Sequence, residues 1–162
     1  MDSRTTHVAR EALSALAGRK TVLVVDDEDS VRELLSVMLE LEGHRVLQAD
    51  RGATALEIAA TEELHLITLD VMMPGLDGWQ VAAALDASAR TASVPRMMVS
   101  GKPLVELDSA PGRARASAVL TKPFDFAEFT DIVRRLMAAP HVMPRPRLSV
   151  EEGASHLYGR VG

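Results

Sequence analysis

The chain has 162 residues, no cysteine and a formal net charge of −5 at neutral pH. A chain of this length can bury enough apolar surface to fold as one ordinary domain. The lack of cysteine excludes disulfides, thiolate metal sites and cysteine redox chemistry. The sequence contains neither a signal-peptide core nor the run of about 18 apolar residues that a membrane span needs, so we expect a cytoplasmic protein without membrane insertion.

The charge is unevenly distributed along the chain. Residues 1–20 carry a net charge of +2 and residues 140–162 one of +1, which leaves −8 for the residues between them. An acidic body repels nucleic acid, and no basic stripe with interleaved aromatic residues offsets this charge. We therefore expect no direct DNA or RNA binding.

Short apolar runs alternate with segments of helical period along the central part of the chain. This pattern is typical of β/α units around a parallel sheet that is covered on both faces. The predicted strands are Thr21–Val25, His44–Ala49, Leu64–Leu69, Val94–Val99 and Ala118–Thr121.

Helices are predicted between these strands and after the last one. The first starts at a cap, Asp29 or Ser30, and stops at Gly43, with apolar residues at helical spacing. Residues 53–60 and 78–88 follow as alanine-rich helices, and Asp125 is the predicted cap of the last helix. The apolar positions are Val31, Leu34, Leu35, Met38 and Leu41 in the first helix, and Phe126, Phe129, Ile132, Val133 and Leu136 in the last.

Three segments have weaker patterns. Leu104–Ser117 has room for a fourth helix, but Pro111 and Gly112 lie inside it, so we expect that helix to be short, broken or mobile. Residues 1–19 form an extension in which Val8, Ala12, Leu13 and Leu16 fit one face of a short helix. We interpret it as a surface extension, with a dimerisation or docking helix as the alternative. Residues 140–162 have no apolar period, so the domain is placed at 20–139 and a disordered tail after it.

Polar residues follow four of the predicted strands. Asp26 and Asp27 follow the first strand, Asp70 the third, Ser100 the fourth and Lys122 the fifth. The carboxyl ends of parallel strands converge on one crevice of such a sheet, so we expect these side chains to lie together. Each residue alone is more typical of a turn, but four strand ends that carry this set together indicate a site.

The predicted site has a clear chemistry. Carboxylates 5 Å apart repel by roughly 3 kcal/mol per pair at an effective dielectric of 20, so three of them need a cation. Oxygen ligands with several charges suit Mg²⁺. With the metal and Lys122 neutralising an incoming phosphoryl group and the Ser100 hydroxyl donating to it, Asp70 can act as the nucleophile of phosphoryl transfer.

From about Lys20 to Ala138 the sequence resembles the receiver domains of two-component response regulators. Four segments carry the resemblance and sit at the intervals typical of that family. They are Val-Leu-Val-Val-Asp-Asp-Glu-Asp at 22–29, Leu-Asp-Val-Met-Met-Pro-Gly-Leu-Asp-Gly at 69–78, Val99-Ser100-Gly101 and Thr121-Lys122-Pro123-Phe124.

This resemblance implies a doubly wound, five-stranded parallel sheet in the order 2-1-3-4-5, the flavodoxin-like receiver fold. It also implies that Asp70 is phosphorylated by a sensor histidine kinase or a phosphotransfer protein, and that Ser100 and Lys122 contact the phosphoryl group. Asp27, Asp70 and the backbone carbonyl of Met72 would bind Mg²⁺ directly, with Asp26 assisting through water. The Lys122–Pro123 peptide bond is expected to be cis.

One position departs from the family pattern. Val119, three residues before Lys122, occupies the switch position, where the family usually has an aromatic residue that turns inward on activation. A small aliphatic side chain cannot make that large rotamer change. We therefore predict that the output is altered and that the signal takes the form of ordering in residues 104–117.

We favour a single-domain response regulator that accepts a phosphoryl group and then switches its binding to an unknown partner, without enzymatic turnover beyond its own phosphorylation and dephosphorylation. An alternative is a receiver-like interaction module that signals without phosphorylation. A haloacid-dehalogenase-like phosphatase also uses aspartate, lysine and Mg²⁺, but its nucleophile would be Asp27. That assignment leaves Asp70 without a role and needs a later acidic pair that the sequence lacks.

Overall fold

The computed structural model describes residues 19–103, 106–107, 109–110 and 116–138. The predicted N-terminal helix and C-terminal tail lie outside these residues, as does most of the predicted fourth helix. Among the described helices, none is long and apolar enough to cross a membrane.

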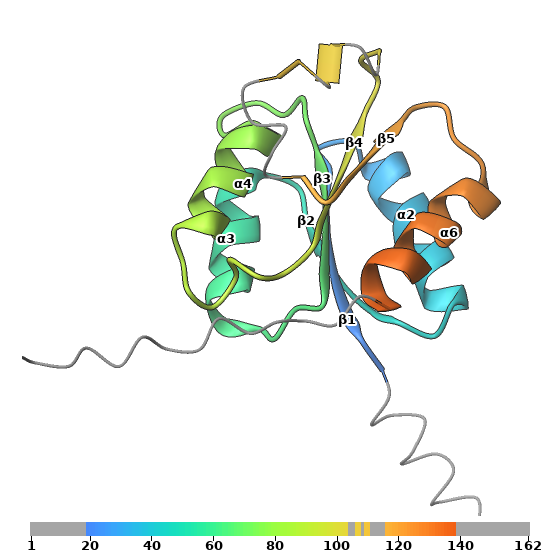
Figure 1. Cartoon of the computed structure of the whole chain (residues 1–162), viewed down its shortest axis with the longest axis horizontal. Coiled ribbons are helices and arrows are strands. Elements are labelled where there is room, and N and C mark those ends of the chain that lie inside the picture. Colours follow the sequence, from blue (N-terminus) through green and yellow to red (C-terminus); the bar gives the residue numbers. More distant parts are fainter. Residues whose placement is uncertain (1–18, 104–105, 108, 111–115, 139–162) are drawn as a thin grey trace, which may run out of the picture.

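A five-stranded parallel sheet forms the centre of the molecule (Figure 1). Its spatial order is β2-β1-β3-β4-β5, and every neighbouring pair is parallel, which confirms the predicted order. The strands are β1 (Thr21–Val25), β2 (Arg45–Ala49), β3 (Leu66–Asp70), β4 (Arg96–Ser100) and β5 (Ala118–Thr121).

Helices cover both faces of this sheet. In Figure 1, α2 and α6 lie on one face and α3 and α4 on the other. Their bounds are α2 (Asp29–Leu41), α3 (Gly52–Thr61), α4 (Gly78–Asp86) and α6 (Phe126–Ala138). This is the doubly wound arrangement that the alternating pattern predicts.

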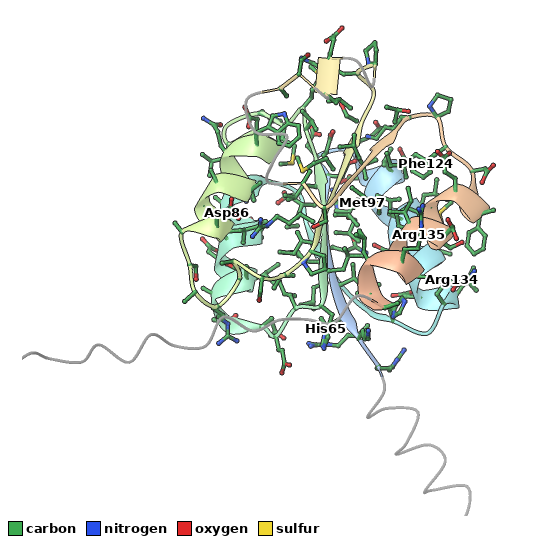
Figure 2. The ribbon with its side chains drawn as sticks, viewed as in Figure 1. His65, Asp86, Met97, Phe124, Arg134 and Arg135 are labelled. Atoms are coloured by element: carbon green, nitrogen blue, oxygen red, sulfur yellow. The ribbon has the colours of Figure 1, made fainter. Side chains whose placement is uncertain are left out.

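The sheet is apolar on both faces, which gives the domain two cores. Along β1, Val22 and Val24 belong to the core under α2 and α6, whereas Leu23 and Val25 belong to the core under α3 and α4. Met97 of β4 is fully buried in the first of these cores (Figure 2). Each large side chain buried in this way stabilises the fold by roughly 1.5–3 kcal/mol.

The predicted bounds of three strands are wrong by one or two residues. β2 begins one residue later than predicted, and β3 and β4 each begin two residues later and end one residue later. Before β3, His65 makes two hydrogen bonds with Thr21 at the start of β1. Thr21 N donates to His65 Nδ1 at 3.0 Å, and His65 N donates to the carbonyl of Thr21 at 2.8 Å. Before β4, Pro95 has no backbone N–H to donate. At their other ends, β3 and β4 extend to Asp70 and Ser100, which are the last residues of these strands.

The helix predictions also need corrections. The N-cap of α2 is Glu28, without a side-chain cap, and not Asp29 or Ser30. Asp125 does cap α6, because its Oδ1 accepts a hydrogen bond from Glu128 N at 2.8 Å. The predicted apolar faces were too wide, since Leu34, Leu41 and Phe126 are exposed.

The described part of the predicted fourth helix is small. Glu106 and Leu107 are helical, and both of their amides donate to the carbonyl of Pro103. Leu107 is 1% exposed and packs into the core under α3 and α4. This side chain anchors the segment beside the carboxyl ends of β3 and β4.

Candidate functional site

The structure brings the predicted carboxylates together at the carboxyl ends of β1 and β3. Asp26, Asp27 and Asp70 each place a carboxylate oxygen within 4.8 Å of the others. Asp26 is fully buried and Asp70 is 6% exposed, whereas Asp27 is open to solvent. The three side chains form an acidic pocket with one exposed member.

Asp26 is held from three directions. Its Oδ1 accepts a hydrogen bond from Glu28 N at 2.9 Å, and its Oδ2 lies 3.1 Å from Lys122 Nζ. Arg32 Nη1 donates to the backbone carbonyl of Asp26 at 2.8 Å. Sequence reasoning identified Lys122 but missed Arg32, which lies one turn into α2 and fixes the start of the acidic loop.

Asp70 has the perturbed carboxyl group of the site. Burial away from water raises its pKa to about 6, and the negative charge of Asp26 and a hydrogen bond with Asp27 act in the same direction. The positive charge of Lys122 and a hydrogen bond from Met72 N to Oδ1, 3.2 Å long, oppose this rise in the pKa. The pocket thus carries more negative charge than its lysine balances.

The excess negative charge of the pocket indicates that its residues suit a cation. Three carboxylates share the pocket, and the Lys122 ammonium is already 3.1 Å from Asp26. Carboxylate and carbonyl oxygens are the ligands that Mg²⁺ prefers, and a divalent ion would offset the repulsion that raises the Asp70 pKa. The donor set therefore fits a hard divalent cation.

Ser100 and Lys122 are linked through the backbone. Ser100 is fully buried, its Oγ accepts a hydrogen bond from Lys102 N at 3.1 Å, and its carbonyl accepts one from Lys122 N at 2.7 Å. The Lys122–Pro123 peptide bond is cis, as predicted. These contacts hold the ends of β4 and β5 beside the acidic pocket.

The remaining two predicted residues are Met72, two residues after Asp70, and Val119 on β5. Met72 donates its amide to Asp70, and its side chain is 59% exposed. Val119 is half-buried and packs against the core under α3 and α4. The ligand role of the Met72 carbonyl and the switch role of Val119 stay predictions.

Gly78, the first residue of α4, closes the motif at 69–78, but its close contact with Asp70 was not predicted from the sequence. A Cβ at this position would lie 2.3 Å from the backbone oxygen of Asp70 and 2.9 Å from Met98 Cε. The Gly78 amide also donates to the carbonyl of Val71 at 3.1 Å. The end of β3 can approach α4 this closely only because position 78 has no side chain.

We expect Gly78→Ala to lower the free energy of unfolding by about 1–3 kcal/mol, because backbone atoms must move to admit the methyl group. Gly101→Ala is the matched control, since a Cβ there would have nothing within 4 Å. Urea unfolding of both variants checks this expectation. Equal stability of the two variants would show that the contact with Asp70 relaxes without cost.

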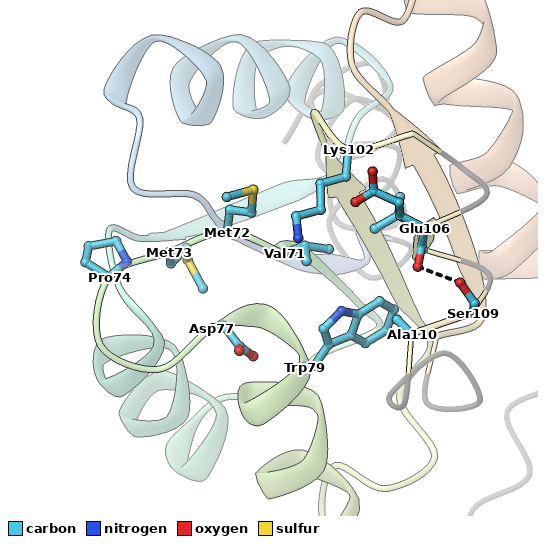
Figure 3. Close-up of a pocket in the computed structure, with 11 residues that line it drawn as sticks. Val71, Met72, Met73, Pro74, Asp77, Trp79, Lys102, Glu106, Ser109 and Ala110 are labelled. Carbon is cyan, nitrogen blue, oxygen red and sulfur yellow. Dashed lines mark hydrogen bonds between the residues drawn. The ribbon is translucent and has the colours of Figure 1, made fainter.

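A pocket opens beside the loop that follows Asp70 (Figure 3). Trp79 and Lys102 point into it from opposite sides, and Ser109 Oγ donates to the carbonyl of Glu106 at 3.3 Å on its rim. Its other lining residues are Val71, Met72, Met73, Pro74, Asp77, Leu107 and Ala110. The surface next to the acidic pocket therefore contains a depression that both apolar and charged side chains line.

Several known proteins are similar to this chain in sequence. A family model described as the response regulator receiver domain matches residues 22–134. Protein PilH of Pseudomonas aeruginosa is 33% identical over 118 residues, which are 72% of this chain and 97% of PilH. The regulatory protein PhoP of Bacillus subtilis is 39% identical over 119 residues, or 73% of this chain but only 48% of PhoP.

A solved structure agrees with these sequence matches. The response regulator TrrA from Thermotoga maritima, in complex with Mg²⁺–BeF, superposes with a TM-score of 0.67 at 30% identity and covers 72% of this chain and 98% of TrrA. With the sheet order, the acidic pocket and the lysine in place, the chain belongs to the response-regulator receiver family.

Proposed function

We propose that this chain is a response-regulator receiver in which Asp70 accepts a phosphoryl group from a sensor histidine kinase or a phosphotransfer protein. The observation that carries the proposal is the buried Asp70 carboxylate, which lies at a strand end with two further carboxylates and a lysine. Residues 20–139 would be the receiver domain, flanked by extensions at 1–19 and 140–162. The family membership supports action in the cytoplasm.

The transfer step uses the Asp70 carboxylate as the nucleophile. An oxygen of Asp70 attacks phosphorus, an acyl-phosphate bond forms, and the bond from phosphorus to the donor breaks with its electron pair leaving on the donor. The amide of Met72 holds Oδ1 at 3.2 Å and so fixes the orientation of the carboxylate. Asp70 is 6% exposed, and the neighbouring Asp27 is open to solvent.

Lys122 and Ser100 would stabilise the oxygens of the phosphoryl group. Lys122 is 3.1 Å from Asp26 in the unphosphorylated chain, so it must reach from that carboxylate toward the new charge. The Ser100 oxygen accepts from Lys102 N, and its hydroxyl proton would donate to a phosphoryl oxygen. Charge-assisted hydrogen bonds of this kind act where negative charge develops.

Asp26, Asp27, Asp70 and the carbonyl of Met72 would hold Mg²⁺, as the donor set of the pocket suits that ion. When bound, the metal supplies positive charge that lowers the repulsion between Asp70 and an incoming phosphoryl group. The complex of TrrA with Mg²⁺–BeF supports the same choice of cation.

The direct test is the intact mass of the protein after incubation with acetyl phosphate and Mg²⁺. We expect a single phosphoryl adduct on the unaltered chain, and no adduct on Asp70→Asn or in the presence of a chelator. Asp131→Asn, a change on the exposed surface of α6, is the control that keeps the adduct. Absence of the adduct under every condition would overturn the proposal.

A phosphorylation-independent interaction module is the second candidate. Val119 favours it, since a half-buried valine at the switch position cannot make the large rotation of an aromatic side chain. If phosphorylation occurs, comparing amide exchange of residues 104–117 with and without acetyl phosphate tests the output. Slower exchange there after phosphorylation supports the ordering that we predict for this segment, and unchanged exchange everywhere favours the module.

A further inference from the structure

Met72 differs from the other described methionines in its exposure to water. Its side chain is 59% exposed, whereas every other methionine among the described residues is at most 9% exposed. These buried methionines are Met38, Met73, Met97, Met98 and Met137. The Met72 side chain also borders the pocket beside the loop that follows Asp70 (Figure 3). A dissolved oxidant can therefore reach the sulfur of Met72 far more easily than the other five sulfur atoms.

Met72 lies beside the proposed phosphoryl acceptor. Its amide donates to Asp70 Oδ1 at 3.2 Å, which fixes the backbone of Met72 against that carboxylate. Exposure alternates along the loop, because Val71 is 6% exposed and Met73 8%, and both belong to the core under α3 and α4. The Met72 side chain therefore turns away from the core and toward solvent, two residues from Asp70, at the carboxyl edge of the sheet.

The thioether of Met72 is a poor partner for water. Its sulfur is only a weak hydrogen-bond acceptor, and the side chain has no donor. Hydrolysis of an acyl phosphate needs a water molecule in line with phosphorus, and a side-chain amide can orient the attacking water in proteins that hydrolyse phosphoryl groups. Unmodified Met72 cannot hold a water in this way, so it gives no help to the hydrolysis of phosphorylated Asp70.

We propose that Met72 is a site of reversible oxidation by peroxide, and that its oxidation shortens the time for which Asp70 stays phosphorylated. The second part of this inference rests on the proposed function. In the oxidation, a lone pair of the Met72 sulfur attacks one oxygen of hydrogen peroxide, so that an S–O bond forms and the O–O bond breaks. The second oxygen leaves as hydroxide and takes up the proton of the first, which gives water. Sulfur loses two electrons and peroxide gains them.

The sulfoxide changes the chemistry beside Asp70. Oxidation converts a flexible apolar side chain into a polar one, and the new oxygen accepts hydrogen bonds as the carbonyl of a glutamine side chain does. This oxygen can hold a water molecule near the phosphoryl group and direct the water's lone pair toward phosphorus. The bond between phosphorus and Asp70 then breaks with its electron pair on the carboxylate, and phosphate leaves while the proton of the water passes to solvent.

Peptide mapping by mass spectrometry after timed exposure to dilute hydrogen peroxide tests the oxidation site. In the folded chain we expect Met72 to be oxidised at least about tenfold faster than each of the five buried methionines, because their sulfur atoms are shielded. In urea, where the chain is unfolded, all six rates should agree within about twofold. Equal rates for Met72 and the buried methionines in the folded chain would overturn the proposal.

The lifetime of the phosphoryl group tests the effect of this oxidation. The chain is phosphorylated with acetyl phosphate and Mg²⁺, the donor is removed, and the loss of the adduct is followed by intact mass. We expect the oxidised chain to lose the adduct at least about threefold faster than the untreated chain, and methionine sulfoxide reductases to restore the original rate. A lifetime that oxidation of Met72 leaves unchanged would contradict the proposal.

Met72→Leu is the matched control, because leucine is apolar and of similar size but cannot form a sulfoxide. Its phosphoryl lifetime should be the same before and after peroxide, although all other methionines remain, including Met1 and Met143 outside the described residues. Met72→Gln should show the short lifetime without peroxide. An equal response of Met72→Leu and the unaltered chain to peroxide would refute the assignment to Met72.

The two experiments also separate this inference from the proposed function on which it rests. Absence of any adduct on the untreated chain would overturn the proposed function, and with it the effect on the phosphoryl lifetime. The oxidation rates need no phosphorylation, so they decide by themselves whether Met72 is a modification site.

Discussion

At pH 8 without divalent cations, Asp70→Asn is expected to raise the free energy of unfolding by about 2–3 kcal/mol. Burial and the charge of Asp26 raise the pKa of Asp70 to about 6 from its ordinary value of 3.8, so the ionised side chain destabilises the folded state. Asparagine keeps the shape of the side chain and an oxygen for the Met72 amide, but it carries no charge.

The effect should depend on pH in a defined direction. The unfolded carboxyl group releases its proton near pH 4 and the folded one near pH 6, so the folded state binds more protons between these values. Stability of the unaltered chain therefore falls as the pH rises through this window, and the advantage of Asp70→Asn grows from nearly zero to its full size. Urea unfolding followed by the fluorescence of Trp79, the single tryptophan, measures this difference at each pH.

Asp131→Asn is the matched control for this experiment. The Asp131 side chain is 66% exposed and lies 3.1 Å from Arg135, so its removal should change stability by less than about 0.5 kcal/mol. A gain from Asp70→Asn that did not vary with pH would contradict the assignment to a buried charge. Adding Mg²⁺ should shrink the gain, because a cation in the pocket stabilises the ionised Asp70.

The fold was predictable because its signals are local. Residues 22–25 are all apolar and have no helical period, which indicates a strand covered on both faces, and Gly43 ends the helix before β2. The helix faces were predicted less well. A period of 3.6 places Leu34 and Leu41 near the apolar side of α2, but how far the sheet extends beneath them is a tertiary property.

The members of the site were predictable for a different reason. Parallel strands bring their carboxyl ends to one edge, so Asp26, Asp70 and Lys122 had to converge once the strands were identified. Their pairing was not predictable. The preference of Lys122 for Asp26, and the closeness of Gly78 to Asp70, depend on distances of a few ångströms that only the packed structure sets.

Arg96 is a further residue whose role the sequence could not reveal. It begins β4 in the middle of an apolar run, yet the structure leaves it only 4% exposed. Nη1 donates to Asp86 at the end of α4, and Nη2 donates to the carbonyls of Thr91 at 3.0 Å and Ala92 at 3.3 Å. One guanidinium thus holds the connection between α4, on which Figure 2 labels Asp86, and β4.

We expect Arg96→Met to lower the free energy of unfolding by about 3–5 kcal/mol, because it removes the donors to two carbonyls and the partner of Asp86 at once. Arg96→Lys should lower the free energy of unfolding by less, because lysine keeps the positive charge. Some loss remains, because lysine lacks the two Nη groups that donate in different directions. Chemical unfolding of the variants at neutral pH measures both losses.

Asp86→Asn separates the ion pair from the carbonyl contacts. The Asp86 side chain is 38% exposed, so water can replace part of its interaction with Arg96, and the guanidinium keeps both carbonyls. The loss should therefore be about 1 kcal/mol, well below that of Arg96→Met. If the two variants lost the same stability, the ion pair would hold the connection and the carbonyl contacts would be dispensable. A larger loss for Arg96→Met would show that a buried arginine acts here mainly as a clamp on the backbone, at the end of β4 opposite Ser100.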